Sequence, residues 1–537
     1  MQTLTSILKL GSSGILGISL LTGTITSCTP DKEEEKQPNI LFIMTDDHSY
    51  QTLSAYDDRY IETPNLDKIA KDGVIFTNSF VGNSICAPSR ATMLTGKHTH
   101  INGQMTNSDV FDGSQQTFPK LLQENGYQTA LIGKWHLKSE PTGFDYWNIL
   151  PGQGSYYNPD FIKMGEEKHY EGYVTNLITD FSIDWLDNKR KKDKPFAMLV
   201  HHKAMHRVWM PDTADLDEFK DKTYPIPETF YDDYEDRPAA AEQRMSIHTE
   251  DMDLVYDLKM ADPEEEIQTR LSDAYRHHGG EYDRMNAEQK ERWNEHYYPI
   301  IEDFKEKDLA GRDLSEWKFQ RYMQDYLAST RSLDDNVGRL LDHLEEQGLL
   351  ENTLVVYTSD QGFYMGEHGW FDKRFIYEES FRTPLLMNLP KGYERQGEVP
   401  ELVQNIDHAP TILDIAGVDI PQDMQGRSLV PLFDKGIEEN WRDAIYYHYY
   451  EFPNEHMVKR HYGVRDDRYK LAHFYYDIDH WEFYDLEKDP QELNNLYNDP
   501  EYQDEIDNMK EKLEELIIQY NDTTAHKIFK GELEVTE

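Results

Sequence analysis

The chain has 537 residues, of which 38% are hydrophobic, and this is enough for one large α/β domain and a smaller second domain. It carries 101 acidic residues against 55 lysines and arginines, so its net charge at pH 7 is -46. This charge argues against nucleic acid, or an anionic membrane surface, as the main partner, and it favours high solubility.

The first 27 residues have the pattern of an export signal. Lys9 precedes an apolar stretch that is too short and too rich in Gly, Ser and Thr to suit a membrane span. The letters "ITSC" place small residues before Cys28, which resembles the lipobox of a bacterial lipoprotein. We therefore expect a lipoprotein signal peptide at 1–27 and export to the periplasm or cell surface, with a lipid on Cys28 as the anchor in the outer membrane. An ordinary signal peptide with an incidental cysteine is the alternative. The charged segment 28–38 suits a flexible tether.

From residue 39 to about 435 the chain alternates between buried strands and helices. The predicted elements are, in chain order, strand 39–47, helix 117–126, strand 127–136, strand 196–206, helix 329–348 and strand 353–362. This alternation predicts an α/β fold with a large, mostly parallel sheet that has helices on both faces. The functional site of such a sheet lies beyond the carboxyl ends of its strands.

Two segments depart from this alternation. Residues of about 212–320 are acidic with scattered aromatic residues, and we interpret them as an inserted helical subdomain or lid, with a plain surface excursion as the alternative. Residues 436–537 predict a smaller α+β subdomain, an antiparallel sheet covered by one helix. Its predicted elements are aromatic strands within 444–451, 461–476 and 481–490 and a long helix at 501–521.

Acidic and amide side chains follow two of the buried strands. Asp46 and Asp47 end the first strand, and Asp360 and Gln361 end a strand far along the chain. Each Asp taken singly could be a turn former or a helix cap. Two such pairs at strand ends indicate an oxygen-rich site for a hard cation such as Ca²⁺ or Mg²⁺.

The stretch "SICAPSRATMLTG" contains a cysteine that needs an explanation. If Cys28 carries a lipid, Cys86 has no partner for a disulfide within the chain. Pro88 suits the first turn of a helix, so we expect Cys86 just before a helix N-terminus, where free N–H groups and the helix dipole favour an anion. Arg90 follows one turn into that helix.

The spacing C-x-P-S-R followed by L-T-G resembles the signature of the type I sulfatases of the alkaline phosphatase superfamily, and the resemblance covers nearly all of residues 38–525. In that family the cysteine is oxidised to formylglycine, whose hydrate is the nucleophile. The resemblance implies the same for Cys86, with a formylglycine-generating or anaerobic sulfatase-maturating enzyme as partner. It also implies one calcium ion, held by modified Cys86 together with Asp46, Asp47, Asp360 and Gln361. The domain 39–435 would then be the catalytic domain.

The resemblance further implies basic residues around a bound sulfate. His206, in "HHKAMH", would be the leaving-group acid or a sulfate binder. The implied catalytic residues are Cys86, Arg90, Lys134, His136, His206 and Lys373. We predict that the substrate is bound by Lys97, His368, Asp372, Arg374 and His456. A further set suits sugar stacking and hydroxyl recognition, with ordinary packing as the alternative for most members: Tyr156, Tyr157, Trp209 and Arg465.

More narrowly, the chain resembles bacterial glycan sulfatases of the N-acetylglucosamine-6-sulfatase kind, on stretches such as "LPGQGSYYNPDF" and "HHKAMHRVWMPD". This implies a sulfated glycan as substrate, specifically the 6-O-sulfate of N-acetylglucosamine in heparan sulfate, keratan sulfate or mucin. Two alternatives stay open. One is a phosphonate or phosphate monoester hydrolase of the same superfamily, and the other is a non-catalytic glycan-binding lipoprotein.

Overall fold

The computed structural model describes residues 37–260, 280–393, 396–433 and 440–533. The expected signal peptide at 1–27, Cys28 and all but the last two residues of the tether lie outside these ranges. Within them, every helix is too short or too polar to cross a membrane.

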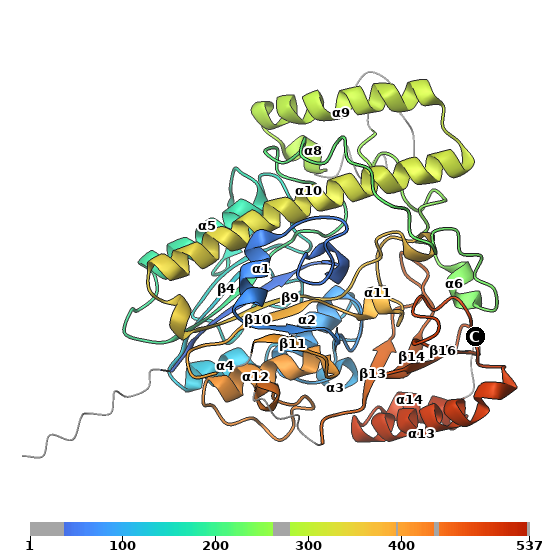
Figure 1. Ribbon diagram of the computed structural model, residues 1–537. Helices are drawn as coiled ribbons and strands as arrows, with labels where there is room; N and C mark the ends of the chain where they lie inside the picture. Colours follow the sequence, from blue (N-terminus) through green and yellow to red (C-terminus); the bar gives the residue numbers. More distant parts are fainter. Residues whose placement is uncertain (1–36, 261–279, 394–395, 434–439, 534–537) are drawn as a thin grey trace, which may run out of the picture. The chain divides into compact units, whose positions relative to one another are not determined.

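Among the described residues, ten strands form one large mixed sheet (Figure 1). Its five central strands run parallel, in the order β9 (Thr353–Ser359), β1 (Asn39–Thr45), β8 (Phe196–His201), β4 (Gln128–Lys134) and β5 (Tyr146–Leu150). The outer strands, which include the antiparallel pairings, are β10 (Leu385–Asn388), β2 (Val74–Phe76), β11 (Gly397–Val399), β6 (Asp160–Lys163) and β7 (Glu166–His169). The predicted large, mostly parallel sheet is confirmed.

Helices cover both faces of this sheet, because its central strands are hydrophobic on both sides. Along β1, Leu41 and Ile43 pack with α1 (Pro64–Lys71), α5 (Val174–Asn188) and α10 (Gly311–Glu346). The alternate residues Ile40, Phe42 and Met44 pack with α2 (Cys86–Thr95), α4 (Phe118–Glu124) and α12 (His408–Ile415). Figure 1 shows these two helical layers with the strands between them. The side-chain period of two along β1 therefore builds two separate cores.

The segment predicted as a helical insertion is only partly helical. In the described residues 211–260 the one helix is the short α6 (Pro238–Glu242), and prolines at 211, 225 and 227 disfavour a helix in the first part of this stretch. Regular helices return with α8 (Glu281–Arg284) and α9 (Ala287–Lys307). The predicted end near residue 320 falls inside α10, whose buried face continues to Leu344.

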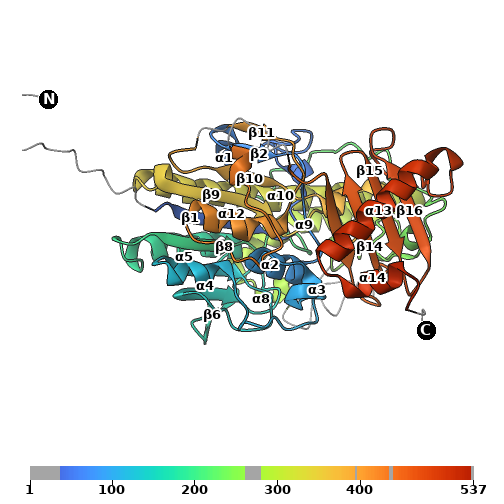
Figure 2. The same ribbon diagram turned by 90° about the horizontal axis from the view of Figure 1, so that it is seen from below.

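The C-terminal part contains a second sheet, as predicted. Its four antiparallel strands are β13 (Ala444–Tyr449), β14 (His461–Asp466), β15 (Tyr469–Phe474) and β16 (His480–Asp485). One face is covered by α13 (Gln503–Gln519) and α14 (Thr523–Phe529), as Figure 2 shows for α13. The other face joins the main core through residues such as Ile445 and Tyr447. The described residues thus form one compact unit, and the boundary at 435 stays a prediction.

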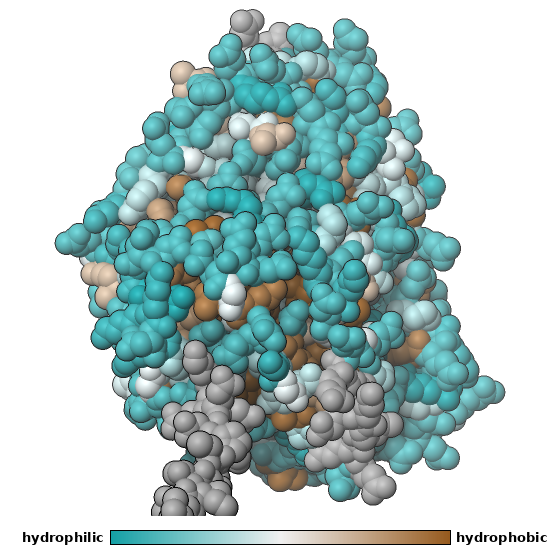
Figure 3. Space-filling view, turned by 60° about the vertical axis from the view of Figure 1, so that its left-hand side comes forward, coloured by the Kyte–Doolittle hydropathy of each residue, from teal (hydrophilic) through white to brown (hydrophobic). Residues whose placement is uncertain are grey.

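The remaining short elements are β3 (Ser79–Phe80), β12 (Val403–Gln404), α3 (Thr99–Asn102) and α11 (Glu378–Phe381). The strands β3 and β12 pair in parallel as a separate two-stranded sheet. Figure 3 shows one face of the molecule, on which hydrophilic side chains predominate and hydrophobic ones lie mainly in recesses. This surface fits the strongly acidic composition.

Candidate active site

Four polar side chains from two strand ends meet beyond the carboxyl edge of the large sheet. The parallel register pairs Thr45 of β1 with Ser359 of β9, so the residues that follow each strand lie next to each other. The Asp360 amide donates to the Thr45 carbonyl at 3.1 Å, and the Asp47 amide donates to Asp360 Oδ1 at 3.2 Å. Carboxylate oxygens of Asp46, Asp47 and Asp360 all lie within 4.8 Å of one another. The predicted convergence of these acids is therefore present.

The composition of this acidic cluster fits a hard divalent cation. Burial, together with Asp46, raises the pKa of Asp360 to about 7. Burial also raises the pKa of Asp47 to about 6, against the opposing effect of Lys373. Beside them, the buried Gln361 Oε1 has no hydrogen-bond partner among the described residues. Three crowded carboxylates and an unsatisfied amide oxygen form an all-oxygen donor set of the kind that binds Ca²⁺.

Cys86 lies against this cluster, at the first residue of α2 rather than just before the helix. Its Sγ is 3.3 Å from Asp46 Oδ1 and 3.8 Å from Gln361 Nε2. Burial and the neighbouring Asp46 raise the pKa of the thiol above its ordinary value. An unmodified Cys86 therefore stays a neutral thiol at pH 7, a weak nucleophile.

Asn107 is a residue at this site that the sequence analysis missed. Its Oδ1 accepts a hydrogen bond from the Ala87 amide at 3.0 Å, one residue after Cys86. Asn107, which lies in a loop about twenty residues further along the chain, thus accepts from the Ala87 amide, an N–H group in the first turn of α2 that has no partner within the helix. The sequence carries no spacing signal for this contact, because the 104–110 loop has no periodic pattern.

Cationic side chains surround the acids. The Arg90 guanidinium donates to Asp360 Oδ2 at 2.8–3.0 Å and to the Lys134 carbonyl at 3.0 Å. Lys134 ends β4, and its Nζ donates to Asp46 Oδ2. Lys373 Nζ lies 2.8 Å from Asp47 Oδ2. Each of the three carboxylates therefore has a positive partner, and the same cations are placed to bind an anion next to a metal ion.

Two histidines complete this group. His136 has a positive φ of 57°, and its buried Nδ1 has no hydrogen-bond partner among the described residues. Burial, together with Lys134, lowers the pKa of His136 to about 2, so its imidazole is neutral at pH 7. A ring nitrogen of His206 lies within 4.8 Å of Asp46 and Cys86. Its Nδ1 is 2.6 Å from the Arg207 carbonyl, and because a carbonyl only accepts, Nδ1 carries a proton.

Three of the predicted substrate contacts form a neighbouring cluster. Asp372 accepts from Arg374 Nε at 3.0 Å and lies 3.2 Å from His456 Nε2. The oxygen that lies near His456, Asp372 Oδ2, is also 3.9 Å from Lys373 Nζ, and Lys373 links this cluster to Asp47. The described structure therefore brings the candidate sugar contacts beside the candidate reaction centre.

The other two predicted substrate contacts have ion-pair partners outside both clusters. Lys97 follows the C-terminal end of α2, and its Nζ pairs with Asp423. Since the ten-residue α2 is about 15 Å long, this places Lys97 far from Cys86. His368 is fully buried, and its Nδ1 lies 2.7 Å from Asp232.

The residues proposed to stack on sugar are also placed differently. Tyr156, Tyr157 and Trp209 are at most 1% exposed. Both tyrosine hydroxyls donate to backbone carbonyls, so the rings belong to the core. Arg465 pairs with Glu378 at 3.3 Å. The packing alternative therefore describes these four residues.

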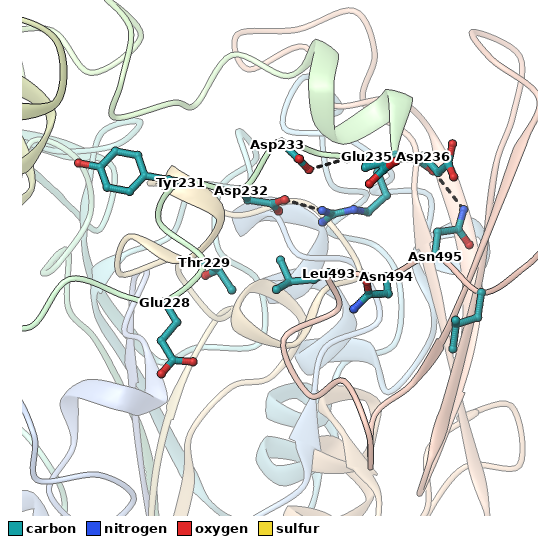
Figure 4. A pocket seen from close by; sticks show the side chains of 12 residues that line it. Glu228, Thr229, Tyr231, Asp232, Asp233, Glu235, Asp236, Leu493, Asn494 and Asn495 are labelled. Atoms are coloured by element: carbon teal, nitrogen blue, oxygen red, sulfur yellow. Dashed lines mark hydrogen bonds and ion pairs between the residues drawn. The ribbon is translucent and has the colours of Figure 1, made fainter.

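Figure 4 shows a pocket that is lined in part by Asp232, the partner of His368. The charge of its lining is unsuited to sulfate. Its lining comes from residues 228–237 and 493–496. Five of the lining side chains are acidic: Glu228, Asp232, Asp233, Glu235 and Asp236. The lining Arg237 is already paired with Asp232 at 2.5 Å. A sulfated ligand would meet net repulsion in this pocket.

Comparison with known proteins agrees with the geometry around Cys86. Residues 38–418 match the Sulfatase family, and residues 366–519 match the family N-sulphoglucosamine sulphohydrolase, C-terminal. The chain therefore belongs to the sulfatase family of the alkaline phosphatase superfamily. It is accordingly a sulfatase, a hydrolase of sulfuric esters. The family implies a formylglycine and typically a metal ion.

Several individual relatives are similar to this chain over most of its length. The N-acetylglucosamine-6-O-sulfatase of Bacteroides thetaiotaomicron is 48% identical over 544 residues, covering 99% of this chain and 96% of the relative. A solved structure of a protein in complex with its substrate D-glucosamine-2-N,6-O-disulfate has a TM-score of 0.87 and 48% identity, covering 91% of this chain and 99% of the other. The human N-acetylglucosamine-6-sulfatase is 28% identical over 446 residues, covering 77% of this chain and 67% of the relative.

The fold by itself does not identify the activity. The phosphonate monoester hydrolase of Agrobacterium radiobacter has a TM-score of 0.65 and 21% identity, covering 90% of this chain and 96% of the other. Proteins with this fold thus carry different activities, and the sulfatase assignment rests on the family match.

Proposed function

We propose that the protein removes the 6-O-sulfate from N-acetylglucosamine or glucosamine units of sulfated glycans, using a formylglycine made from Cys86 and one calcium ion. The near-full-length similarity to an N-acetylglucosamine-6-O-sulfatase supports the substrate. The observation that carries the chemistry is the 3.3 Å contact of Cys86 Sγ with Asp46. It puts the residue to be modified at the edge of the oxygen cluster.

The calcium ligands in this proposal are Asp46, Asp47, Asp360 and Gln361, joined by the modified Cys86. Their close carboxylates and the unpartnered Gln361 Oε1 support this choice. When bound, the ion supplies positive charge that polarises the sulfate and favours an ionised nucleophile. The hydrate of formylglycine supplies the attacking hydroxyl, together with a second hydroxyl whose loss of a proton lets the sulfate leave again.

The basic residues have separate tasks. Lys134 and Lys373 neutralise the negative charge of the sulfate oxygens. Their ammonium groups are placed for this because each lies against a carboxylate of the cluster, beside the proposed sulfate position. Arg90 holds Asp360 and, through the Lys134 carbonyl, the end of β4. The neutral His136 accepts a hydrogen bond from the hydrate, which its unpartnered Nδ1 makes feasible.

His206 is the proton donor to the leaving sugar oxygen in this proposal. Its Nδ1 proton is committed to the Arg207 carbonyl, so donation from Nε2 requires the imidazolium, which carries a proton on both nitrogens. Burial lowers the pKa of His206 and Asp46 opposes this effect, so the negative charge of a bound sulfate ester would further favour the imidazolium. Asp372, Arg374 and His456 bind sugar hydroxyls beside Lys373, and their mutual ion pairs keep them oriented.

We also propose export and lipid anchoring through Cys28, based on the apolar stretch after Lys9 and the small residues of "ITSC". Production of the full chain in a Gram-negative host with a labelled fatty acid tests this. The proposal expects label on the wild type and none on Cys28→Ala. Label on neither form, with both retained in the cytoplasm, would contradict it.

The substrate proposal is tested with a panel of monosulfated sugars scored for released sulfate. The panel compares N-acetylglucosamine 6-sulfate with the 2-O- and 3-O-sulfated sugars, galactose 6-sulfate and a phosphonate monoester. We expect the N-acetylglucosamine 6-sulfate to react fastest, by about tenfold or more over the other sugars, because mispositioned sulfate loses the oriented contacts. Preference for a galactose isomer would contradict the sugar assignment, and preference for the phosphonate would contradict the ester class.

A further inference from the structure

His206 stands in a loop, so its orientation depends on contacts made by that loop. The strand β8 ends at His201, and the described residues that follow, up to Pro211, form turns without helix or strand. The His206 imidazole is tied to the same loop through the Arg207 carbonyl. A shift of this backbone would therefore move the ring nitrogen that lies within 4.8 Å of Asp46 and Cys86.

Three buried tyrosine hydroxyls hold this loop by its carbonyl groups. Tyr156 donates to the His206 carbonyl at 2.5 Å. Tyr173 donates to the Met210 carbonyl at 2.9 Å, and Tyr157 donates to the Pro211 carbonyl at 2.5 Å. Of the three contacts, the one made by Tyr156 is to His206 itself. The other two act four and five residues further along the chain.

Tyr156 is itself fixed from two sides. The carboxylate of Glu281, on α8, accepts hydrogen bonds from the amides of Tyr156 at 2.8 Å and Tyr157 at 3.2 Å. The ammonium group of Lys203 lies over the Tyr156 ring, 4.7 Å from its centroid. Lys203 precedes His206 in the same loop, so α8 holds the backbone of Tyr156 and that loop contacts its ring. A phenol held in this way is a rigid hydrogen-bond donor.

We propose that Tyr156 is a positioning residue for His206. The Tyr156 hydroxyl fixes the His206 carbonyl and thereby the direction of the His206 imidazole. The inference rests on the proposed function, in which His206 protonates the leaving sugar oxygen. In Tyr156→Phe the carbonyl keeps its bond from the Trp209 amide at 3.1 Å but loses the phenol, and the imidazole is less well aimed.

The need for protonation depends on the leaving group, and this gives a specific test. A sugar alkoxide is a strong base that leaves slowly without a proton, whereas 4-nitrophenolate leaves readily without one. For Tyr156→Phe we expect kcat with N-acetylglucosamine 6-sulfate to fall about tenfold or more, with KM within about twofold. With 4-nitrophenyl sulfate we expect a loss of about twofold or less.

Tyr173→Phe is the matched control, because it removes a hydroxyl that binds the same loop four residues beyond His206. We expect it to keep the wild-type ratio of the two rates. Equal losses with both substrates in Tyr156→Phe, or the same change of ratio in Tyr173→Phe, would overturn the proposal.

If Tyr156→Phe also lowers the melting temperature, the double variant Tyr156→Phe/His206→Ala separates a positioning role from a general loss of stability. If Tyr156 acts through His206, Tyr156→Phe adds little further loss of sugar sulfate turnover, about twofold at most, to His206→Ala. Full additivity of the two losses would refute the positioning role. If the wild type rejects N-acetylglucosamine 6-sulfate, the comparison is made with the sugar sulfate that it does hydrolyse, so the two proposals fail separately.

Discussion

Cys86 Sγ lies 3.3 Å from Asp46 Oδ1, although the two residues belong to different layers of the molecule. Asp46 follows the central strand β1, and Cys86 begins α2, which packs on the face of the sheet. The first turn of that helix therefore meets the carboxyl edge of the sheet. This relationship joins the candidate nucleophile to the candidate metal ligands in one buried site.

Replacing one of the proposed calcium ligands is expected to remove metal binding and most of the turnover. Asp360→Asn removes one of three carboxylates within 4.8 Å of one another, so we expect a loss of kcat of about a hundredfold or more. Metal content measured by mass spectrometry after dialysis should fall in parallel. Asp342→Asn is the control, since Asp342 makes an exposed pair with Lys68 and should leave both unchanged. Full metal content in Asp360→Asn would show that the ion binds elsewhere.

Metal-free protein is expected to lose stability as the pH rises from about 4 to 7. The folded-state pKa values of Asp47, about 6, and Asp360, about 7, are above the unfolded value, which is about 3.9. Folding therefore favours their protonated forms, and this contribution is lost as the pH rises through the folded pKa values. We expect the melting temperature of chelated protein to fall over this range, and calcium to remove the trend.

The control for this pH dependence is Asp360→Asn, which lacks one of the two titrating groups. Its chelated form should show a flatter profile than the chelated wild type between pH 5 and 8. Identical slopes in the two proteins would mean that other groups cause the trend.

Replacing Cys86 is expected to remove turnover while leaving the sugar contacts. Cys86→Ala deletes the proposed nucleophile and little else, so sulfate release should fall to background. Binding of the 6-sulfated sugar, measured by calorimetry, should stay within about tenfold of the wild type, because Lys373, Arg374 and His456 are retained. Even modest turnover by this variant would mean that another group attacks the sulfate.

Two of the three predicted site lysines, Lys373 and Lys97, are expected to behave differently. Lys373→Ala removes a buried ammonium 2.8 Å from Asp47, so we expect kcat/KM to fall about a hundredfold or more. Lys97→Ala removes a partner of the exposed Asp423 and should change kcat/KM by about twofold at most. A large loss of kcat/KM in Lys97→Ala, with an unchanged melting temperature, would show that Lys97 does contribute to substrate binding.

Much of the fold could be predicted because strong local patterns determine it. The apolar runs that became β1 and β9 are buried on both faces, which is typical of the central strands of a parallel sheet. Polar residues directly after such strands must lie at the same edge of the sheet, which is why Asp46 and Asp360 could be paired from the sequence. The aromatic strands and the amphipathic α13 carried equally clear signals.

The unpredicted features depend on contacts between distant irregular segments. The distance of Lys97 from Cys86 follows from the length of α2, and the sequence analysis predicted where this helix begins but not where it ends. His368 is buried beside Asp232 from the insertion, and the loop that carries Asp232 has no periodic pattern. Tyr156 looked like a sugar-stacking residue because aromatic residues serve both cores and binding sites, and the structure places it in the core.

The most direct test of the central claim is mass spectrometry of the peptide that contains Cys86, compared with the sulfatase activity of the same preparation. The account predicts an aldehyde in place of the thiol, in a fraction that rises with activity when a maturating enzyme is coexpressed. A fully active preparation in which Cys86 is an unmodified thiol would contradict it.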